Sequence, residues 1–137
     1  MVERRPKGGS VPIKLSVLGI AVKNMGESLQ FYRQLGLEIP EGQDAEGHVQ
    51  IEGDGITLAW DTVEVLAGVY GEWNDRPTGH RIEVAFECGS RAEVDATYAR
   101  IVARGPHGHR EPWDAFWGQH YAIVTDPDGN LISLFAQ

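Results

Sequence analysis

The sequence predicts an α+β fold in which two βαβββ modules form a curved mixed sheet around a cleft, with the helices outside. The order strand, helix, strands occurs twice, and the first strands of the two halves lie about 66 residues apart. The segments "DGITL" and "DGNLISL" end the two halves in the same way. A duplicated unit of this kind typically gives two curved sheets that share one cleft.

The first half begins at residues 13–22, "IKLSVLGIAV", where apolar residues alternate as in a half-buried strand. Asn24 and Glu27 have the spacing of a helix N-cap and its partner, and Gly36 is expected to end that helix. Two more strands, joined by a turn at "GDG", are predicted near residues 47–52 and 56–60.

The second half repeats this order. The segment "HRIEVAFEC" at residues 80–88 alternates as a strand, and Ser90 with Glu93 forms a capping-box pair for a helix that Gly105 ends. Three strands follow, the last two joined by a turn at "DPDG", and they are predicted near residues 108–111, 119–125 and 130–136.

These patterns divide the chain into a tail and one domain. Residues 1–11 are predicted to be a disordered tail, and residues 12–137 form the domain. Its three parts are the first module, a linker with one helical turn, and the second module, at about residues 12–61, 62–79 and 80–137.

The acidic composition excludes several function classes. With a formal net charge of −8 at pH 7, the chain is expected to bind neither nucleic acid nor an anionic membrane. No apolar run has the length of a membrane span, and the opening residues lack the apolar centre of a signal peptide. Because Cys88 is the one cysteine, an internal disulfide and a cysteine-rich metal site are excluded. We therefore expect a cytoplasmic protein.

Two segments, "GIAVKNMGESLQFYRQLGLEIP" and "YAIVTDPDGNLISLF", resemble the first strand–helix unit and the closing hairpin of the vicinal oxygen chelate superfamily. That superfamily includes glyoxalases, extradiol dioxygenases and bleomycin-resistance proteins. The resemblance covers roughly residues 13–136. It implies a homodimer whose clefts can be built from both chains.

The superfamily's enzymes typically hold a divalent metal through four side chains on inward faces of the strands. The corresponding positions in this sequence are Val17, Thr57, Glu83 and Ser133. One carboxylate, two hydroxyls and a valine are a poor ligand set for such an ion. This resemblance therefore implies a relative without the metal, and we expect no cofactor and no catalytic residue.

The segments "ITLAWDTVEV", "TGHRIEVAFE" and "EPWDAFWGQHYAIVTDPDGN" are most similar to the mitomycin-resistance type, whose members bind planar quinone or polycyclic antibiotics. In that type a histidine and the second tryptophan of a "PW…W" segment face the drug, and by position these are His48 and Trp117. Further ligand contacts are expected from Trp60, Trp113, Tyr121 and Glu83. Core packing remains an alternative for Trp60, and a structural salt bridge to Arg81 or Arg110 remains one for Glu83.

Aromatic side chains can hold a planar ligand by stacking. We therefore expect a resistance or self-resistance protein that sequesters a planar aromatic or quinone-type antibiotic between such side chains, without catalysis. The main alternative is a metal-dependent enzyme of the glyoxalase or dioxygenase type with atypical ligands. Its minimum ligand set would be Glu83 with His48 or His120. A third alternative is a ligand-sensing accessory subunit.

Overall fold

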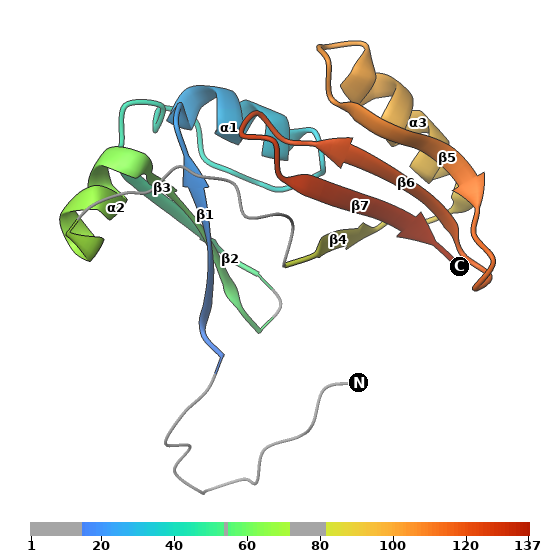
Figure 1. The fold of residues 1–137 in the computed structure, drawn as a ribbon, viewed down its shortest axis with the longest axis horizontal. Helices are drawn as coiled ribbons and strands as arrows, with labels where there is room; N and C mark the ends of the chain where they lie inside the picture. The colour runs from blue at the N-terminus through green and yellow to red at the C-terminus, as the bar shows by residue number, and fades with distance from the viewer. Residues whose placement is uncertain (1–14, 54, 72–81) are drawn as a thin grey trace, which may run out of the picture.

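The computed structural model describes residues 15–53, 55–71 and 82–137. The predicted tail, part of the predicted linker, Arg81 and the middle of the "GDG" turn lie outside these residues. In chain order the elements are β1 (Val17–Val22), α1 (Met25–Arg33), β2 (His48–Glu52), β3 (Thr57–Thr62), α2 (Val63–Tyr70), β4 (Val84–Glu87), α3 (Arg91–Val102), β5 (Gly108–Asp114), β6 (His120–Thr125) and β7 (Leu131–Ala136) (Figure 1).

The strands form two small sheets, which confirms the predicted α+β class (Figure 1). The first sheet has the order β1-β3-β2, and the second has the order β4-β7-β6-β5. In both sheets the first strand is parallel to the last strand of its module, while the other pairs are antiparallel. The modules therefore share a topology, as the repeat predicts.

The first module differs from the predicted βαβββ order because it has three strands within the described residues. The missing strand is the counterpart of β5, and its place in the chain is the segment between α1 and β2. That segment reads "LEIPEGQDAEG": its alternation stops after Leu37 and Ile39, and its proline cannot donate a backbone hydrogen bond. It forms an irregular loop instead.

The helix starts follow the local sequence. The Asn24 side chain accepts a hydrogen bond from the Glu27 amide at 2.9 Å, and Ser90 Oγ accepts one from the Glu93 amide at 3.1 Å. Both predicted caps are thereby confirmed. In the linker, Thr62 caps α2, which has eight residues and is longer than the single predicted turn. Within the described part of the chain, no helix is long and apolar enough to cross a membrane.

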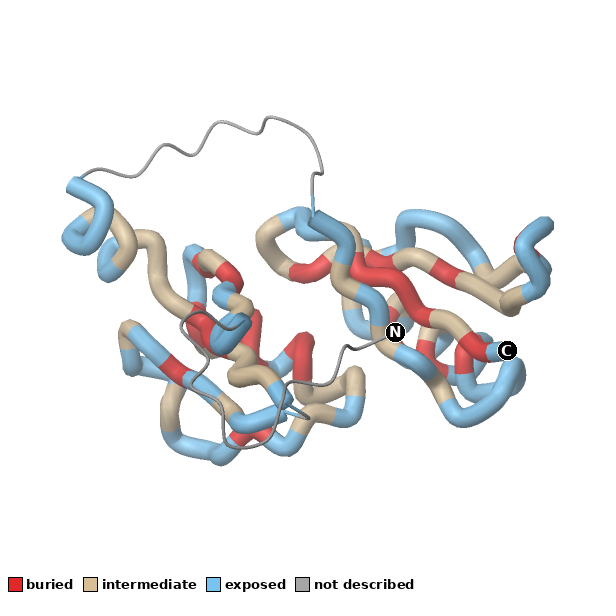
Figure 2. The backbone as a smooth tube through the Cα atoms, turned by 90° about the horizontal axis from the view of Figure 1, so that it is seen from below, coloured by how far each residue is buried: buried red, intermediate tan, exposed pale blue. Residues whose placement is uncertain are grey.

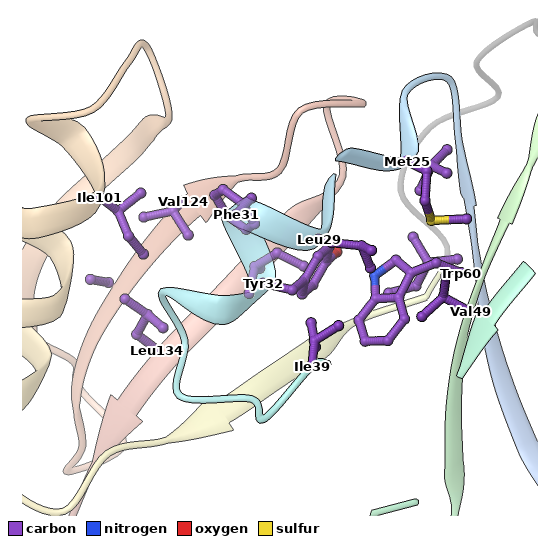
Figure 3. Close-up of a cluster of buried hydrophobic side chains, with 14 of the residues drawn as sticks. Met25, Leu29, Phe31, Tyr32, Ile39, Val49, Trp60, Ile101, Val124 and Leu134 are labelled. Carbon is purple, nitrogen blue, oxygen red and sulfur yellow. The ribbon is translucent and has the colours of Figure 1, made fainter. Parts of the chain in front are cut away.

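The two modules share one hydrophobic core, in which buried residues come from both sheets and from α1 and α3. In contrast to the predicted placement of both helices on the outside, α1 lies between the modules. Figure 3 shows its side chains between those of Val124 and Trp60, namely Leu29, Phe31 and Tyr32. Figure 2 shows buried backbone in both halves, whereas α2 has no buried residue.

Each sheet therefore has a core face and an open face. On the first sheet, Ile20, Trp60 and Val49 lie in register and are all buried in the core. Because side chains alternate along a strand, their neighbours in sequence lie on the opposite face. The open faces of both sheets are turned away from the shared core, and these open faces carry most of the side chains expected to bind ligand.

Candidate ligand-binding site

The aromatic residues near the end of the chain gather on the open face of the second sheet. Trp113 on β5 lies opposite Tyr121 on β6, and Tyr121 lies opposite Phe135 on β7. Residues directly opposite one another in an antiparallel sheet share a face, so these three rings form a row across three strands. Trp117, in the β5–β6 connection, joins the row with its ring centroid 5.3 Å from that of Tyr121.

Trp113, Trp117 and Tyr121 line a pocket of about 470 Å³, which we call the aromatic pocket. Its volume lies within the range of about 300–1,000 Å³ that is usual for small-molecule sites. All of its lining residues belong to the second module: Glu83, Arg110, Trp113, Trp117, Gln119, Tyr121, Ile123 and Ser133. Four residues that the sequence singled out for ligand contact, Glu83, Trp113, Trp117 and Tyr121, are therefore brought together.

The rings in this pocket meet at steep angles. The planes of Trp113 and Trp117 are 89° apart, and those of Trp117 and Tyr121 are 80° apart. Edge-to-face contact of this kind is favourable between aromatic rings. It also means that these rings form a corner, so a planar ligand would stack on one ring and meet the edges of the others.

The connection between β5 and β6 presents Trp117 to solvent. Its tight turn is closed by the amide of Ala115, which donates to the Gln119 carbonyl, and by the amide of Gly118, which donates to the Ala115 carbonyl. Gly118 has a φ of 100°, a conformation that glycine adopts without strain. Trp117 remains 49% exposed and donates its indole N–H to Gln119 Oε1 at 2.9 Å. Its ring is both held in place and accessible.

Two charged side chains flank the rings. The Arg110 guanidinium carbon lies 3.6 Å from the Trp113 ring centroid, a cation–π contact that occupies one face of that indole. Glu83 is exposed just before β4 and forms no ion pair with another described residue. The pocket therefore offers a cation and a carboxylate to polar groups on a ligand.

His48 lies on the open face of the first sheet, away from the aromatic pocket. Its Nδ1 is 2.6 Å from Asp61 Oδ1, and its Nε2 is 2.8 Å from Gln50 Oε1. Acceptors at both nitrogens, from Gln50 and then Asp61, raise the pKa of His48 because they stabilise the doubly protonated ring. The neighbouring residues on that face are small, namely Gly19, Ala21 and Ala59. The chain thus has a second polar surface, on which small residues lie beside the polar cluster.

Trp60 is fully buried and lies on the core face of β3. Its ring contacts that of Tyr32 with the centroids 5.5 Å apart. Of the two readings that the sequence left open for this residue, the structure supports core packing and places the ring out of reach of a ligand on the open face. The strand alternation of Ile56, Leu58 and Trp60 already pointed to that face.

The four positions that would hold a divalent ion in metal-dependent relatives do not fit one. Val17 lies beside Thr57 in the first sheet and offers no lone pair. The Thr57 hydroxyl donates to Glu52 Oε2 at 3.3 Å, and Ser133 is a buried hydroxyl in the second sheet. A divalent ion generally needs three or more donors in place, and Glu83 is the one carboxylate of the four. Among the described residues, no three His, Cys, Asp or Glu side chains are grouped to hold a metal.

Sequence reasoning missed Asp61, Gln50 and Gln119 as partners of the predicted site residues. Asp61 and Gln50 share the parity of Thr57 and His48 on their strands, so alternation could have placed them on the open face. Gln119 had no comparable signal, because its contact with Trp117 depends on the shape of a turn.

Two larger hollows lie elsewhere on the described surface. One of about 650 Å³ lies between α1, α3 and β4, and one of about 750 Å³ lies between the core face of the first sheet and β4. Neither is lined by a tryptophan. The aromatic pocket is therefore the better candidate for a planar ligand.

Comparisons with known proteins agree with this fold. A glyoxalase-related enzyme from Fulvimarina pelagi superposes with a TM-score of 0.77 at 21% identity, covering 90% of this chain and 88% of that one. A glyoxalase/bleomycin resistance protein/dioxygenase from Nocardioides superposes with a TM-score of 0.69 at 25% identity, covering 94% of this chain and 86% of that one. A protein from S. aureus superposes with a TM-score of 0.75 at 19% identity, covering 94% of this chain and 96% of that one. These similarities show the fold.

No match is found among curated proteins. The family model "Glyoxalase/Bleomycin resistance protein/Dioxygenase superfamily" matches residues 14–134, which is nearly the whole chain. The superfamily resemblance seen in the sequence is thereby confirmed, and the chain belongs to the glyoxalase/bleomycin resistance protein/dioxygenase superfamily.

Proposed function

We propose that this protein binds a planar aromatic ligand in the aromatic pocket and sequesters it without catalysis. The ligand class is a quinone-type or polycyclic antibiotic, as in the mitomycin-resistance type that the sequence resembles. The observation that supports this proposal most strongly is the half-exposed Trp117, whose ring stands beside Trp113 and Tyr121 at the corner of the pocket.

The energetics require more than one stacked ring. A single aromatic stack contributes about 0.5–1.5 kcal/mol beyond area burial, whereas micromolar affinity needs about −8 kcal/mol. Removing roughly 200–300 Å² of apolar ligand surface from water would contribute about 5–7.5 kcal/mol at ~25 cal/mol per Å². A ligand lying on the corner of rings would keep one of its faces in water. A second surface is needed to cover that face.

A second copy of the chain can supply this surface. Among the described residues, the open face of the first sheet carries small residues beside the His48, Asp61 and Gln50 cluster, but no aromatic ring. The aromatic pocket has the rings, and no described residue of the same chain covers them. In a homodimer, the first sheet of one protomer would close the aromatic pocket of the other and bring the partner's His48 toward the ligand. Exposed apolar side chains, Val17 on β1 and Val65, Val69 and Tyr70 on α2, are consistent with a covered surface.

Isothermal titration calorimetry with a mitomycin, an anthraquinone and a bleomycin tests this proposal. We expect saturable micromolar binding of one planar ligand, and we expect Trp117→Ala to weaken it by about tenfold to a hundredfold. Phe116→Ala is the comparison variant: Phe116 is 97% exposed and does not line the pocket, and of the pocket rings it contacts only Trp117, edge to face, with ring centroids 5.0 Å apart, so its removal should weaken binding less than Trp117→Ala does. Absence of saturable binding by all three ligands, or equal losses in the two variants, would contradict the proposal.

A further inference from the structure

A cluster of charged side chains lies behind the loop that carries Trp117. It consists of Arg91 and Asp95 on α3, Asp114 at the end of β5 and His120 at the start of β6. We call it the Asp114 network. His120 and Tyr121 are consecutive on β6, so their side chains lie on opposite faces of the second sheet. The network therefore lies on the helix side, while the aromatic pocket lies on the open side.

Arg91 ties three separate segments together. Its Nη1 donates to Asp114 Oδ1 at 2.9 Å, and its Nη2 donates to the Gly118 carbonyl at 3.0 Å. Its Nε donates to the Gln137 carbonyl at 3.2 Å. Asp114 and Gly118 flank the short loop that presents Trp117, so one guanidinium holds both ends of that loop. A rigid planar group with several donors is suited to such a role.

His120 bridges two carboxylates. Its Nδ1 is 2.8 Å from Asp114 Oδ1, and its Nε2 is 2.7 Å from Asp95 Oδ1. Carboxylates accept hydrogen bonds, so both ring nitrogens donate at once only when the ring is an imidazolium. These bonds, first that of Asp95 and then that of Asp114, raise the pKa of His120. The bond from His120 in turn holds the pKa of Asp114 below its usual value, with a smaller contribution from Arg91.

No other charged group faces this imidazole from the elements around it within the described residues. Its paired residue on β7 is Ala136, which is uncharged. The charged residues on α3 near the ring are Asp95 and Arg91. The His120 side chain is 14% exposed, whereas its carboxylate partners are mostly in solvent. The proton on His120 is therefore the part of the network that decides whether both bridges exist.

We propose that Arg91, Asp114 and His120 are positioning residues that fix the Trp117 loop for ligand binding, and that loss of the His120 proton loosens it. This inference rests on the proposed function for its effect on affinity. Its effect on the Trp117 ring is present in the free protein.

The pH dependence follows from the direction of the shift. Below the raised pKa of His120, the imidazolium donates to Asp95 and to Asp114 at once. As the pH rises through that pKa, the neutral ring keeps one N–H, and one carboxylate faces a lone pair. The loop is then held by Arg91 alone, because His120 no longer carries a positive charge. Ligand affinity should fall over the same pH range.

Fluorine NMR of the protein labelled with 5-fluorotryptophan tests the inference. The Trp117 and Trp60 resonances are assigned by single substitution to phenylalanine. We expect the Trp117 resonance to shift with pH, with a midpoint above the ordinary histidine pKa of about 6.5. Asp95→Asn should move this midpoint to lower pH, because it removes a charge that stabilises the imidazolium. The buried Trp60 resonance should stay fixed and serves as the internal control.

Arg91→Met should displace the Trp117 resonance at every pH and weaken mitomycin binding at pH 6 by about fivefold or more. Arg104→Met is the matched control, since Arg104 lies just beyond the other end of α3, outside the network. The inference would be overturned if the chemical shift of the Trp117 resonance did not change with pH, with Asp95→Asn or with Arg91→Met. Because these shifts are read without ligand, they remain decisive if no antibiotic binds and the proposed function itself fails.

Discussion

At the scale of single residues, Trp60 and Trp117 place the same side chain in opposite environments. Trp60 alternates onto the core face of β3 and is 0% exposed, whereas Trp117 follows the end of β5 and is 49% exposed. The Trp117 indole N–H donates to Gln119, but that of Trp60 is buried with no hydrogen-bond partner in the described structure. One indole is therefore available to a ligand, while the other contributes to stability at the cost of an unpaired donor.

Substitutions at Trp60 should reflect this difference. Trp60→Ala should lower the free energy of unfolding by about 3–5 kcal/mol, because it leaves a large cavity in the core. Trp60→Phe should cost only about 1 kcal/mol, because the smaller cavity is partly offset by removal of a buried, unpaired N–H. Urea unfolding followed by circular dichroism measures both, with the exposed Phe116→Ala as control. Equal losses for Ala and Phe would show that the unpaired donor is not a feature of the folded protein.

At the scale of elements, the β6–β7 turn connects the second module to α1. Asp126 is 2% exposed and accepts hydrogen bonds from the amides of Asp128 and Asn130, as expected for an aspartate that starts a tight turn. It also accepts a bond from the Tyr32 hydroxyl at 2.8 Å. Burial, and then the Asp126 carboxylate, raise the pKa of Tyr32, so the phenol remains protonated and donates. One carboxylate thus shapes the turn and fastens it to the first module.

Removing the Tyr32 hydroxyl should loosen this connection. Tyr32→Phe should lower the free energy of unfolding by about 1.5–3 kcal/mol, since the lost bond is buried and has a charged acceptor. Tyr98→Phe, whose hydroxyl makes no hydrogen bond within the described residues, is the control and should change stability by less than about 0.5 kcal/mol. Denaturant unfolding of both variants decides the matter. A loss at Tyr32 no larger than at Tyr98 would mean that the hydroxyl does not hold the modules together.

At the scale of the whole molecule, the sequence predicts the structural features that depend on residues close together in the chain. The caps at Asn24 and Ser90 involve bonds across three residues, and strand alternation places Trp60 on the face of Ile56 and Leu58. How the modules pack depends on contacts such as Tyr32 to Asp126, which join residues 94 positions apart. Local spacing contains no information on those contacts. For this reason the sequence could not place α1 between the sheets, or reveal that His48 and Trp117 lie on different open faces.

In one chain, the rings of the second sheet and the polar face of the first sheet are both turned away from the shared core, and under the proposed function they would form the two halves of one site. A binding protein with this arrangement needs two copies to enclose a planar ligand, and it needs no reacting group. Assembly, ligand stoichiometry and chemical fate of the ligand are therefore linked, and one measurement can read all three.

That measurement is native mass spectrometry of the protein with the planar ligand that calorimetry selects, followed by mass analysis of the released ligand. We predict a dimer carrying two ligands, each released with its mass unchanged, and a sharp loss of bound ligand in Trp117→Ala. A released molecule of altered mass would establish an enzyme instead. A monomer that binds ligand as tightly as the wild-type assembly would contradict a site shared by two chains.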